Sequence, residues 1–508
     1  MFSSSVRYVA VDVRFPGCKC RGIFQGEKHR IPAETPRNSR ETLRVEENAH
    51  AAILAQSCKI RTMYSFLEKM YWNIFTLWHA RHEGRLPFWS IDRIRDLQSR
   101  RVKAIIAHAY ATVPFYREAM DRERLRPGDF RTADDLEKLP LVTGNDLAEA
   151  PERFFSRRYT GDRTFTLDTS GTSGRSKYVR HDRSELFLMM AYGQRHREVL
   201  AHFLGRRLGY RELIVCPQTS ASFELRDFYE AHSWVPPGMD FKRAALRPEG
   251  RIEDNLEIIN SFKPDLIRGY GSYIGALFKE AYLRGVTLHR PKAVLYGADL
   301  MPEYDRKLIE NHFGVPVLSG YQSTECLRIA YQCERRQGFH VNVDHVAVRI
   351  VDGNGCTLLP GERGEIVVSN LVNRGTVLLN YKLGDIVSLD RDSCPCGRSL
   401  PTLGQIDGRA GELILLPGGD VVHALMLIED FLTVPGVVQV QMRQHDVARF
   451  SLLVVCRADV DWQEIKDGLE KAMTSFFGST VLVGIERTDI IPPDSGGKVR
   501  RFISECLV

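Results

Sequence analysis

The sequence lacks a long uninterrupted apolar stretch, because no run approaches the roughly 18 residues needed to cross a bilayer. The first residues also lack the continuous apolar core of a secretory signal, so we expect no export signal. An excess of one charge is absent too: 70 Lys and Arg are interspersed with 64 Asp and Glu, which leaves a net charge of +6. This balance argues against nucleic acid as a partner and weakly favours small anionic ligands.

The cysteines do not form the pattern of a disulfide framework. There are 11 of them, an odd number in a chain of 508 residues, which favours a reducing cytoplasm. Internal repeats are also absent. The hydrophobic fraction of 43% and the charged fraction of 26% are typical of a soluble globular protein, and the length predicts more than one domain.

Residues 1–60 differ in texture from the rest of the chain. They combine Cys18-Lys19-Cys20, surrounded by Gly, Arg and Pro, with a polar stretch over 27–48. We therefore expect a peripheral or poorly ordered N-terminal segment. From Ile91 to Ala109, apolar residues recur at helical spacing and predict a scaffold helix.

Strands and helices alternate in the middle of the chain, which predicts an α/β fold with parallel sheets wrapped by helices. Ligands bind such sheets at the carboxyl ends of the strands, where the loops 297–299 and 320–325 are expected. The predicted strands are 164–167, 213–216, 265–267, 292–296 and 315–318, and the predicted helices are 183–204, 252–262, 273–283 and 302–313.

The sequence pattern changes after residue 345. Alternating strands over 345–351 and 365–369 predict a hairpin-rich subdomain, and the last hundred residues read as a small α/β module. We predict a large domain over 61–408 that includes the β-rich subdomain, and a small mobile C-terminal lid domain over 409–508.

The most distinctive loop is Thr169-Ser170-Gly171-Thr172-Ser173-Gly174-Arg175-Ser176-Lys177. We predict that it connects the strand 164–167 to the helix 183–204. Glycines allow successive N–H groups to converge on one anion, and hydroxyls and a lysine add donors, which suits a polyphosphate. The loop is not a Walker motif, because the Gly-Lys-Ser/Thr ending is absent. The alternative is a flexible Ser/Gly turn.

The order and spacing of five motifs resemble the adenylate-forming superfamily of acyl-CoA synthetases, adenylation domains and luciferases. The five are the loop 169–177, Tyr321-Gln322-Ser323-Thr324-Glu325, Tyr381-Lys382-Leu383-Gly384-Asp385, Gly408-Arg409 and Gly496-Gly497-Lys498. Further stretches resemble phenylacetate–CoA ligase and its capsule-biosynthesis relatives. These stretches are His108-Ala109-Tyr110, Val113-Pro114-Phe115-Tyr116-Arg117, Leu139-Pro140-Leu141 and Cys394-Pro395-Cys396-Gly397-Arg398. The resemblance covers roughly residues 85 to 508.

This resemblance implies an AMP-forming acid–thiol ligase that uses ATP, Mg²⁺ and coenzyme A. A carboxylate would attack the α-phosphate of ATP to give an acyl-AMP, and a thiol would then take the acyl group. The default substrate is a small aromatic carboxylic acid. We expect a cytoplasmic protein with neither nucleic acid as a partner nor a membrane span, and a homodimer is left open. The alternative is transfer of the acyl group to an amine, a hydroxyl or a carrier-protein thiol.

The resemblance also implies roles for individual residues. Thr324 and Glu325 would contact the α-phosphate and Mg²⁺, and Lys498 would bridge the carboxylate and the α-phosphate. Gly411 takes a hinge position, and Asn380 replaces an arginine common in relatives, which leaves the substrate open. The implied nucleotide-binding residues are Thr169, Ser170, Gly171, Thr172, Ser173, Gly174, Lys177, Gly297, Ala298, Asp299, Tyr321, Thr324, Asp385 and Arg409.

Three cysteines and a histidine form a candidate zinc set. Cys394 and Cys396 lie in one tight turn, and Cys333 and His340 lie about 60 residues earlier. Three sulfurs and an imidazole suit a four-coordinate structural zinc. The alternative is that these are buried apolar thiols. No motif defines the pocket for the acyl group, and Phe223, Tyr229 and Trp234 lie either in this pocket or in the core.

Overall fold

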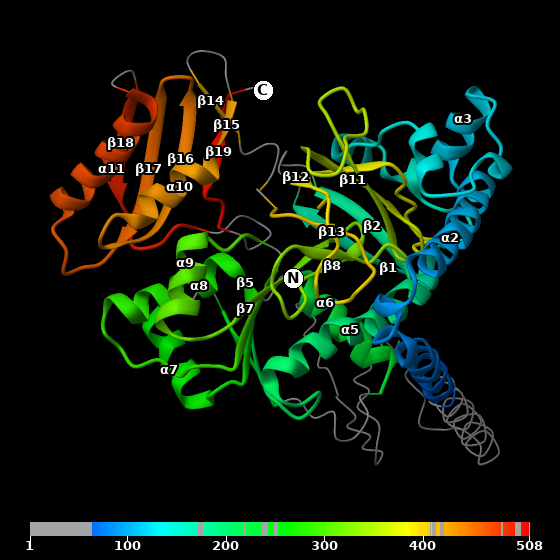
Figure 1. Ribbon diagram of the computed structural model, residues 1–508, viewed down its shortest axis with the longest axis horizontal. Helices are drawn as coiled ribbons and strands as arrows, with labels where there is room; N and C mark the ends of the chain where they lie inside the picture. Colours follow the sequence, from blue (N-terminus) through cyan, green and yellow to red (C-terminus); the bar gives the residue numbers. More distant parts are fainter. Residues whose placement is uncertain are drawn as a thin grey trace, which may run out of the picture. The chain divides into compact units, whose positions relative to one another are not determined.

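The computed structural model divides into two compact units, Met1–Phe66 and Leu67–Val508. The predicted peripheral segment 1–60 lies outside the described residues, so the fold below is that of the second unit (Figure 1). Within the described part of the chain, no helix is both long and apolar enough to cross a membrane. The described residues are 63, 65–170, 176–216, 220–234, 242–247, 252–297, 299–406, 408, 413–416, 421–478, 481–492 and 499–506.

The central element is an eight-stranded sheet with the strand order β13-β9-β8-β7-β6-β5-β3-β4. One part is parallel and consists of β4 (Lys242–Leu246), β3 (Arg211–Val215), β5 (Leu266–Tyr270), β6 (Ala293–Gly297) and β7 (Val317–Ser323). The other part is antiparallel and consists of β8 (Leu327–Tyr331), β9 (Phe339–Val341) and β13 (Thr402–Leu403). The strand direction therefore changes beside β7.

Helices alternate with the parallel strands, as the sequence predicts. The longest of them begins at Asp182, whose carboxylate accepts hydrogen bonds from the backbone N–H groups of Ser184 and Glu185, and it ends at Gly205 in the left-handed region. Such an N-cap and C-cap define helix ends well. The helices are α5 (Arg183–Leu204), α6 (Ala221–His232), α7 (Ile252–Phe262), α8 (Gly271–Leu283) and α9 (Glu303–Lys307), followed by a π-helical turn Leu308–His312.

A helical layer precedes the sheet in the sequence. It starts with a helix over residues 65–83 and continues with α2 (Ile91–Thr112), α3 (Pro114–Arg122) and α4 (Gly144–Glu149). The buried residues of α2 include the predicted apolar stripe. Short 3-10 helices connect these elements: Leu86–Phe88, Pro127–Asp129, Asp134–Lys138, Pro151–Phe154 and Gly161–Arg163.

The segment before α5 differs from the prediction. β1 (Thr164–Ser170) pairs with β2 (Ser176–Asp182) in an antiparallel hairpin, so the Ser/Thr/Gly stretch connects two strands rather than a strand and a helix. The sequence missed β2 because polar residues flank Val179 and the helical pattern begins immediately afterwards. A three-stranded antiparallel sheet, β10 (Val346–Val351), β11 (Arg363–Asn370) and β12 (Tyr381–Ser388), forms the predicted β-rich part.

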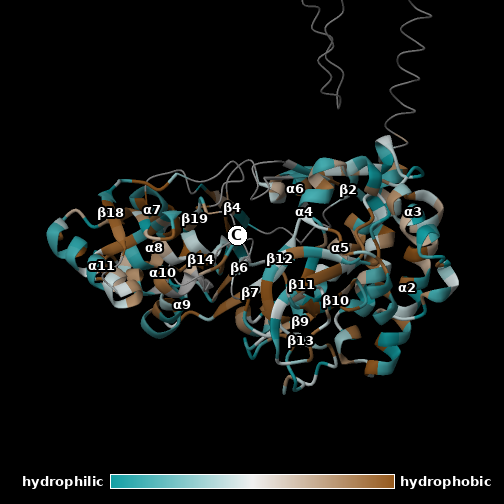
Figure 2. Cartoon of the chain, turned by 90° about the horizontal axis from the view of Figure 1, so that it is seen from above, coloured by the Kyte–Doolittle hydropathy of each residue, from teal (hydrophilic) through white to brown (hydrophobic). Residues whose placement is uncertain are grey.

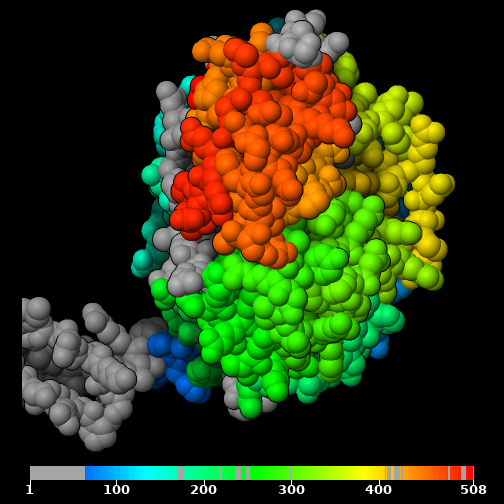
Figure 3. All heavy atoms as spheres, turned by 90° about the vertical axis from the view of Figure 1, so that its left-hand side faces the viewer, coloured from blue at the N-terminus to red at the C-terminus, as the bar shows by residue number. Residues whose placement is uncertain are grey.

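The C-terminal residues form their own mixed sheet with the order β18-β17-β16-β19. Leu427, Phe431 and Leu452 belong to the core of this module, which is orange to red in Figure 3. The predicted boundary at 408/409 stays a prediction, because 409–412 lie outside the described residues. The elements are β14 (Leu413–Leu415), β15 (Val421–His423), α10 (Ala424–Thr433), β16 (Val437–Asp446), β17 (Arg449–Cys456), α11 (Trp462–Phe477), β18 (Leu482–Arg487) and β19 (Phe502–Ser504).

The hydropathy colouring shows hydrophobic segments in strands such as β10 and β11, and both hydrophobic and hydrophilic segments in helices such as α2 and α3 (Figure 2). The interior also contains a buried ionic network. Arg195 of α5 pairs with Asp344 at 2.8 Å and with Glu83 at 2.6 Å, and the hydroxyl of Tyr192 donates to Asp344 at 2.7 Å. Arg101 of α2 also pairs with Asp344 at 3.2 Å. The network joins α2 and α5 to the segment before β10, so it fixes the helix that lines the site.

Candidate active site

A cleft of about 1870 Å³ opens at the carboxyl ends of the parallel strands. Its lining includes Gly297 at the end of β6, Tyr321 in β7, Glu325 after β7 and Asp385 in β12. The stretch predicted as the loop 320–325 is in part strand, because β7 continues through Ser323. The cleft therefore lies at the edge of the sheet where the sequence predicts a ligand site.

Lys177, Glu325 and Tyr381 form a polar triangle in this cleft. The Lys177 Nζ lies 2.9 Å from Glu325 Oε1 and donates to the Tyr381 hydroxyl at 3.2 Å, and that hydroxyl donates to Glu325 Oε1 at 3.1 Å. Burial alone would raise the pKa of Glu325, but Lys177 and Tyr381 lower it below its usual value. The carboxylate is therefore ionised and can bind a hard cation. The sequence did not indicate the bridging role of Tyr381.

Tyr321 and Asp385 form a second pair, with the Tyr321 hydroxyl donating to Asp385 Oδ2 at 2.6 Å. Gly297 lies beside them, and a Cβ at this position would come within 3.0 Å of the Gly320 carbonyl. The close approach of β6 and β7 therefore favours a residue without a side chain here. Asp299 instead accepts a hydrogen bond from the Ser272 backbone N–H at 3.3 Å, at the first turn of α8.

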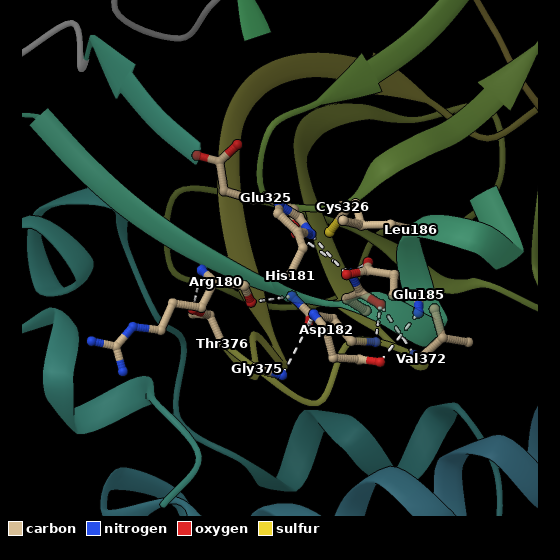
Figure 4. A network of polar contacts seen from close by, with 12 residues as sticks. Arg180, His181, Asp182, Glu185, Leu186, Glu325, Cys326, Val372, Gly375 and Thr376 are labelled. Carbon is tan, nitrogen blue, oxygen red and sulfur yellow. Dashed lines mark hydrogen bonds and ion pairs between the residues drawn. The ribbon is translucent and has the colours of Figure 1, made fainter. Parts of the chain in front are cut away.

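A buried polar layer around His181 and Glu185 lies beside Glu325 (Figure 4). His181 Nδ1 lies 2.7 Å from Glu185 Oε2, and Asn370 donates to Glu185 Oε1 at 2.8 Å and to the Glu325 carbonyl at 3.4 Å. His345 donates to the Cys326 carbonyl at 2.6 Å. Burial opposes the charge on His181, but Glu185 and the Thr324 backbone raise its pKa above the usual value. These contacts hold the backbone that carries Thr324 and Glu325, and no sequence motif indicated them.

Several residues of the predicted site cannot be placed. Thr169 and Ser170 lie in β1, where their backbones pair with Lys177 and Ser176. Seven further predicted nucleotide-binding or catalytic residues lie outside the described residues, and their roles stay predictions. They are Gly171, Thr172, Ser173, Gly174, Ala298, Arg409 and Lys498.

The predicted metal set comes together in space. The ligand atoms of Cys333, His340, Cys394 and Cys396 all lie within 4.8 Å of one another, with Cys333 Sγ and Cys394 Sγ at 3.7 Å. His340 Nε2 lies 3.3 Å from Cys396 Sγ, while Nδ1 faces the Leu400 carbonyl at 3.4 Å. Burial lowers the pKa of His340 to about 4, so the ring is neutral. This geometry suits a metal ion whose histidine ligand is oriented by its other nitrogen.

Comparison with known proteins gives relatives along most of the chain. Phenylacetate-coenzyme A ligase of Thermus thermophilus is 26% identical over 454 residues, which cover 81% of this chain and 96% of the relative. Protein CapK of Staphylococcus aureus is 22% identical over 423 residues, covering 80% of this chain and 89% of CapK. No family model matches the chain.

Solved structures show the same fold. The crystal structure of 2-hydroxyisobutyryl-CoA ligase in the postadenylation state, in complex with R3-HIB-AMP, aligns with a TM-score of 0.65 at 17% identity. The alignment covers 84% of this chain and 92% of that structure. An open conformation of the same ligase aligns with a TM-score of 0.52 at 18% identity, covering 80% and 90% of the two chains. The chain therefore has the fold of the adenylate-forming acyl-CoA ligases, and its sequence is similar to phenylacetate–CoA ligases and CapK.

Proposed function

We propose that the chain is an ATP-dependent carboxylate–CoA ligase that works through an acyl-AMP. The observation that supports this best is the triangle of Lys177, Glu325 and Tyr381 beside the Tyr321–Asp385 pair, at the ligand-binding edge of the sheet. The same fold holds acyl-AMP in the 2-hydroxyisobutyryl-CoA ligase structure. The phenylacetate–CoA ligase relatives cover most of the chain and support the same chemistry.

In the first half-reaction, a carboxylate oxygen of the acid bonds to the α-phosphorus of ATP. The bond from that phosphorus to the bridging oxygen breaks, and pyrophosphate leaves with the electron pair. The loop 169–177 with Lys177 would hold the departing phosphates, and Thr324 would donate to the α-phosphate. Glu325 would hold Mg²⁺, which supplies charge neutralisation at the phosphates. Asp385 and Arg409 would bind the ribose, and Lys498 would contact the reacting oxygens.

In the second half-reaction, the thiol of coenzyme A attacks the acyl carbonyl and AMP leaves as the mixed anhydride breaks. We expect the C-terminal domain to rotate about Arg409-Ala410-Gly411 between the two steps, because a glycine at the hinge permits large backbone changes. Lys498 would then serve only the first step.

The proposal is tested by measuring pyrophosphate and AMP release over a panel of carboxylic acids, with and without coenzyme A. Release of AMP and pyrophosphate that depends on one acid, followed by thioester formation, is the expected result. Release of ADP and phosphate would mean an acyl-phosphate mechanism and would refute the proposal.

The similarity to CapK favours one alternative function, in which the acyl acceptor is not coenzyme A. The acyl group would pass to an amine, a hydroxyl or a carrier-protein thiol, as in a capsule or secondary-metabolite tailoring step. In that case pyrophosphate release would proceed with the correct acid, but coenzyme A would not be consumed. Trapping of the acyl-AMP with hydroxylamine in the absence of coenzyme A separates activation from transfer.

The proposal also covers the substrate class, the metal, the location and the oligomeric state. An aromatic acid is the default substrate, and Phe223, Tyr229 and Trp234 line the cleft. The Cys/His cluster would hold a structural zinc. A cytoplasmic location and a homodimer are the remaining expectations, and sedimentation of the purified chain tests the second of these.

A further inference from the structure

An arginine that lines the cleft, Arg328, has no carboxylate partner in the described part of the chain. Arg328 of β8 lines the cleft, and its Nε donates to the Met189 carbonyl at 3.1 Å. Within the described ranges, its guanidinium forms no ion pair with a carboxylate. A charge inside a protein lowers the stability of the fold unless a partner of opposite sign compensates for its loss of hydration. The unpaired guanidinium of Arg328 therefore destabilises the fold at this position.

The neighbours of Arg328 increase this cost. Burial is the main cause that lowers the pKa of Arg328 to about 10, and the positive charges of Arg268 and Arg197 lower it further. Glu212, another acid that lines the cleft, is already engaged, because it binds Arg243 at 2.6 Å and Arg268 at 3.1 Å. The region around Arg328 is therefore electropositive.

The guanidinium of Arg328 lies against α5, the helix that carries Met189. Gly193 lies in the middle of α5, and a Cβ there would come 3.5 Å from a terminal nitrogen of Arg328. One turn later, His196 also lines the cleft, and its Nε2 is buried without a hydrogen-bond partner in the described structure.

This region lies next to the reaction centre. Arg328 is the strand partner of Gln322, so it lies one strand away from the segment that carries Tyr321 and Thr324. His196 packs close to Gly320 of β7, since a Cβ on that glycine would come within 2.9 Å of the ring. A small acid activated at Thr324 would therefore extend toward Arg328.

We propose that Arg328, with Gly193 and His196, forms a subsite for a second acidic group, so that the substrate is a carboxylic acid bearing a further anion. This inference rests on the proposed function and names its substrate class. The second group is a carboxylate, sulfonate or phosphate, because all three match the donors of a guanidinium. It provides the negatively charged partner that Arg328 lacks among the described residues.

The experiment compares matched pairs of acids in the pyrophosphate-release assay. The pairs are glutarate with pentanoate, and 4-carboxyphenylacetate or 4-sulfophenylacetate with 4-methylphenylacetate. We expect kcat/KM at least about tenfold higher for the acid with the second anion, the lower end of the effect of a hydrogen bond to a charged group. Arg328→Gln should remove this preference mainly through KM and leave the monoacid within about twofold of its wild-type value, while Arg328→Lys should retain part of it. Arg95→Gln on α2 is the matched control, because Arg95 is exposed and lies far from this strand in sequence.

Thermal stability gives a readout that a structural arginine would not show. Arg328→Gln removes an unpaired charge, so its melting temperature should equal or exceed that of the wild type. The acids with a second anion should raise the melting temperature of the wild type but not that of Arg328→Gln.

Three results would overturn the inference. They are a preference for monoacids, an equal loss for both members of each pair in Arg328→Gln, or a clear fall in melting temperature of that variant. If no acid releases pyrophosphate, the proposed function fails, and the inference is then decided by calorimetric binding. Binding of 4-carboxyphenylacetate that is lost in Arg328→Gln supports the subsite, and equal binding of both acids to both proteins overturns it.

Discussion

Lys177 Nζ and Glu325 Oε1 lie 2.9 Å apart, although 148 positions separate the two residues in the sequence. The lysine comes from the β1–β2 hairpin and the glutamate from the end of β7. Only 7% of the surface of Glu325 is exposed, so solvent screens this pair weakly. A bound polyphosphate would pair with Lys177, and its cation would pair with Glu325. Nucleotide binding would therefore replace this ion pair.

Glu325→Gln should slow pyrophosphate release by at least ~10², a typical loss when one preorganised charge is removed. It should also shift the Mg²⁺ dependence to higher concentrations, because an amide is a poorer ligand for a hard cation. Titration of the initial rate with Mg²⁺ measures both effects. Glu362→Gln, at an exposed turn, is the control, and a wild-type Mg²⁺ profile in Glu325→Gln would contradict the assignment.

Lys498→Ala should slow acyl-AMP formation by at least ~10², because the lysine would meet charge that develops in the first step. With pre-made acyl-AMP and coenzyme A, the same variant should form thioester at nearly the wild-type rate. Gly411→Pro should show the opposite pattern, since a fixed φ restricts the hinge. Stopped assays of each half-reaction measure these rates. An equal loss in both steps for Lys498→Ala would make the lysine structural.

The Cys/His cluster predicts about one zinc per chain in protein purified without chelator, because a closed site of this type binds metal as part of folding. The double variant Cys394→Ser, Cys396→Ser should lose the metal and melt at a lower temperature. Cys356→Ser is the control, because this cysteine is exposed and outside the cluster. Full metal content in the double variant would refute the ligand set.

Asp344 gives a prediction for acid stability. Burial alone would raise its pKa, but Arg195 and Arg101 lower the pKa of Asp344 well below its usual range. A depressed pKa contributes stability above the unfolded value near 3.9, and this contribution is lost as the pH falls below it. Asp344→Asn should therefore cost about 3–5 kcal/mol at pH 7, because it leaves Arg195 without its partner in the interior, and less at pH 3.

Urea unfolding at several pH values measures this difference. Burial raises the pKa of Glu83, another member of the network, and the charge of Asp344 raises it further. The effect of Glu83 on stability therefore has the opposite sign and is smaller in Asp344→Asn. Asp446→Asn, at an exposed pair with Arg449, should change little. A constant difference between Asp344→Asn and the wild type from pH 7 to pH 3 would show that the carboxylate charge is not responsible.

The sequence predicted helices better than the contacts between them. Arg183–Leu204 and Ile252–Phe262 have the predicted bounds, because each has a clear apolar periodicity. β2 was missed because only Val179 in its centre is strongly apolar, so local pattern could not separate a hairpin from a loop.

The candidate site shows the same limit. The motifs marked Tyr321, Glu325 and Asp385 as a group, but pairings such as Tyr321 with Asp385 depend on how β7 and β12 meet. Asn380 is a second case, since its departure from the relatives left the substrate open. The structure shows a buried residue at φ 57° whose amide donates to the Leu139 carbonyl at 2.6 Å. Asn tolerates this backbone conformation, so the residue supports the start of β12, the strand that carries Asp385.

The position of the Cys/His cluster in the chain has a consequence for the unfolded state. Cys333 and Cys394 are 61 positions apart, and the intervening segment contains the whole β10–β11–β12 sheet with Tyr381 and Asp385. A metal bound to both ends would close this segment into a loop before the chain folds. By analogy with a covalent cross-link, closing a loop of this length removes about 4 kcal/mol of chain entropy from the unfolded state. Metal supply would then decide how readily the subdomain that carries these two residues assembles on the main sheet.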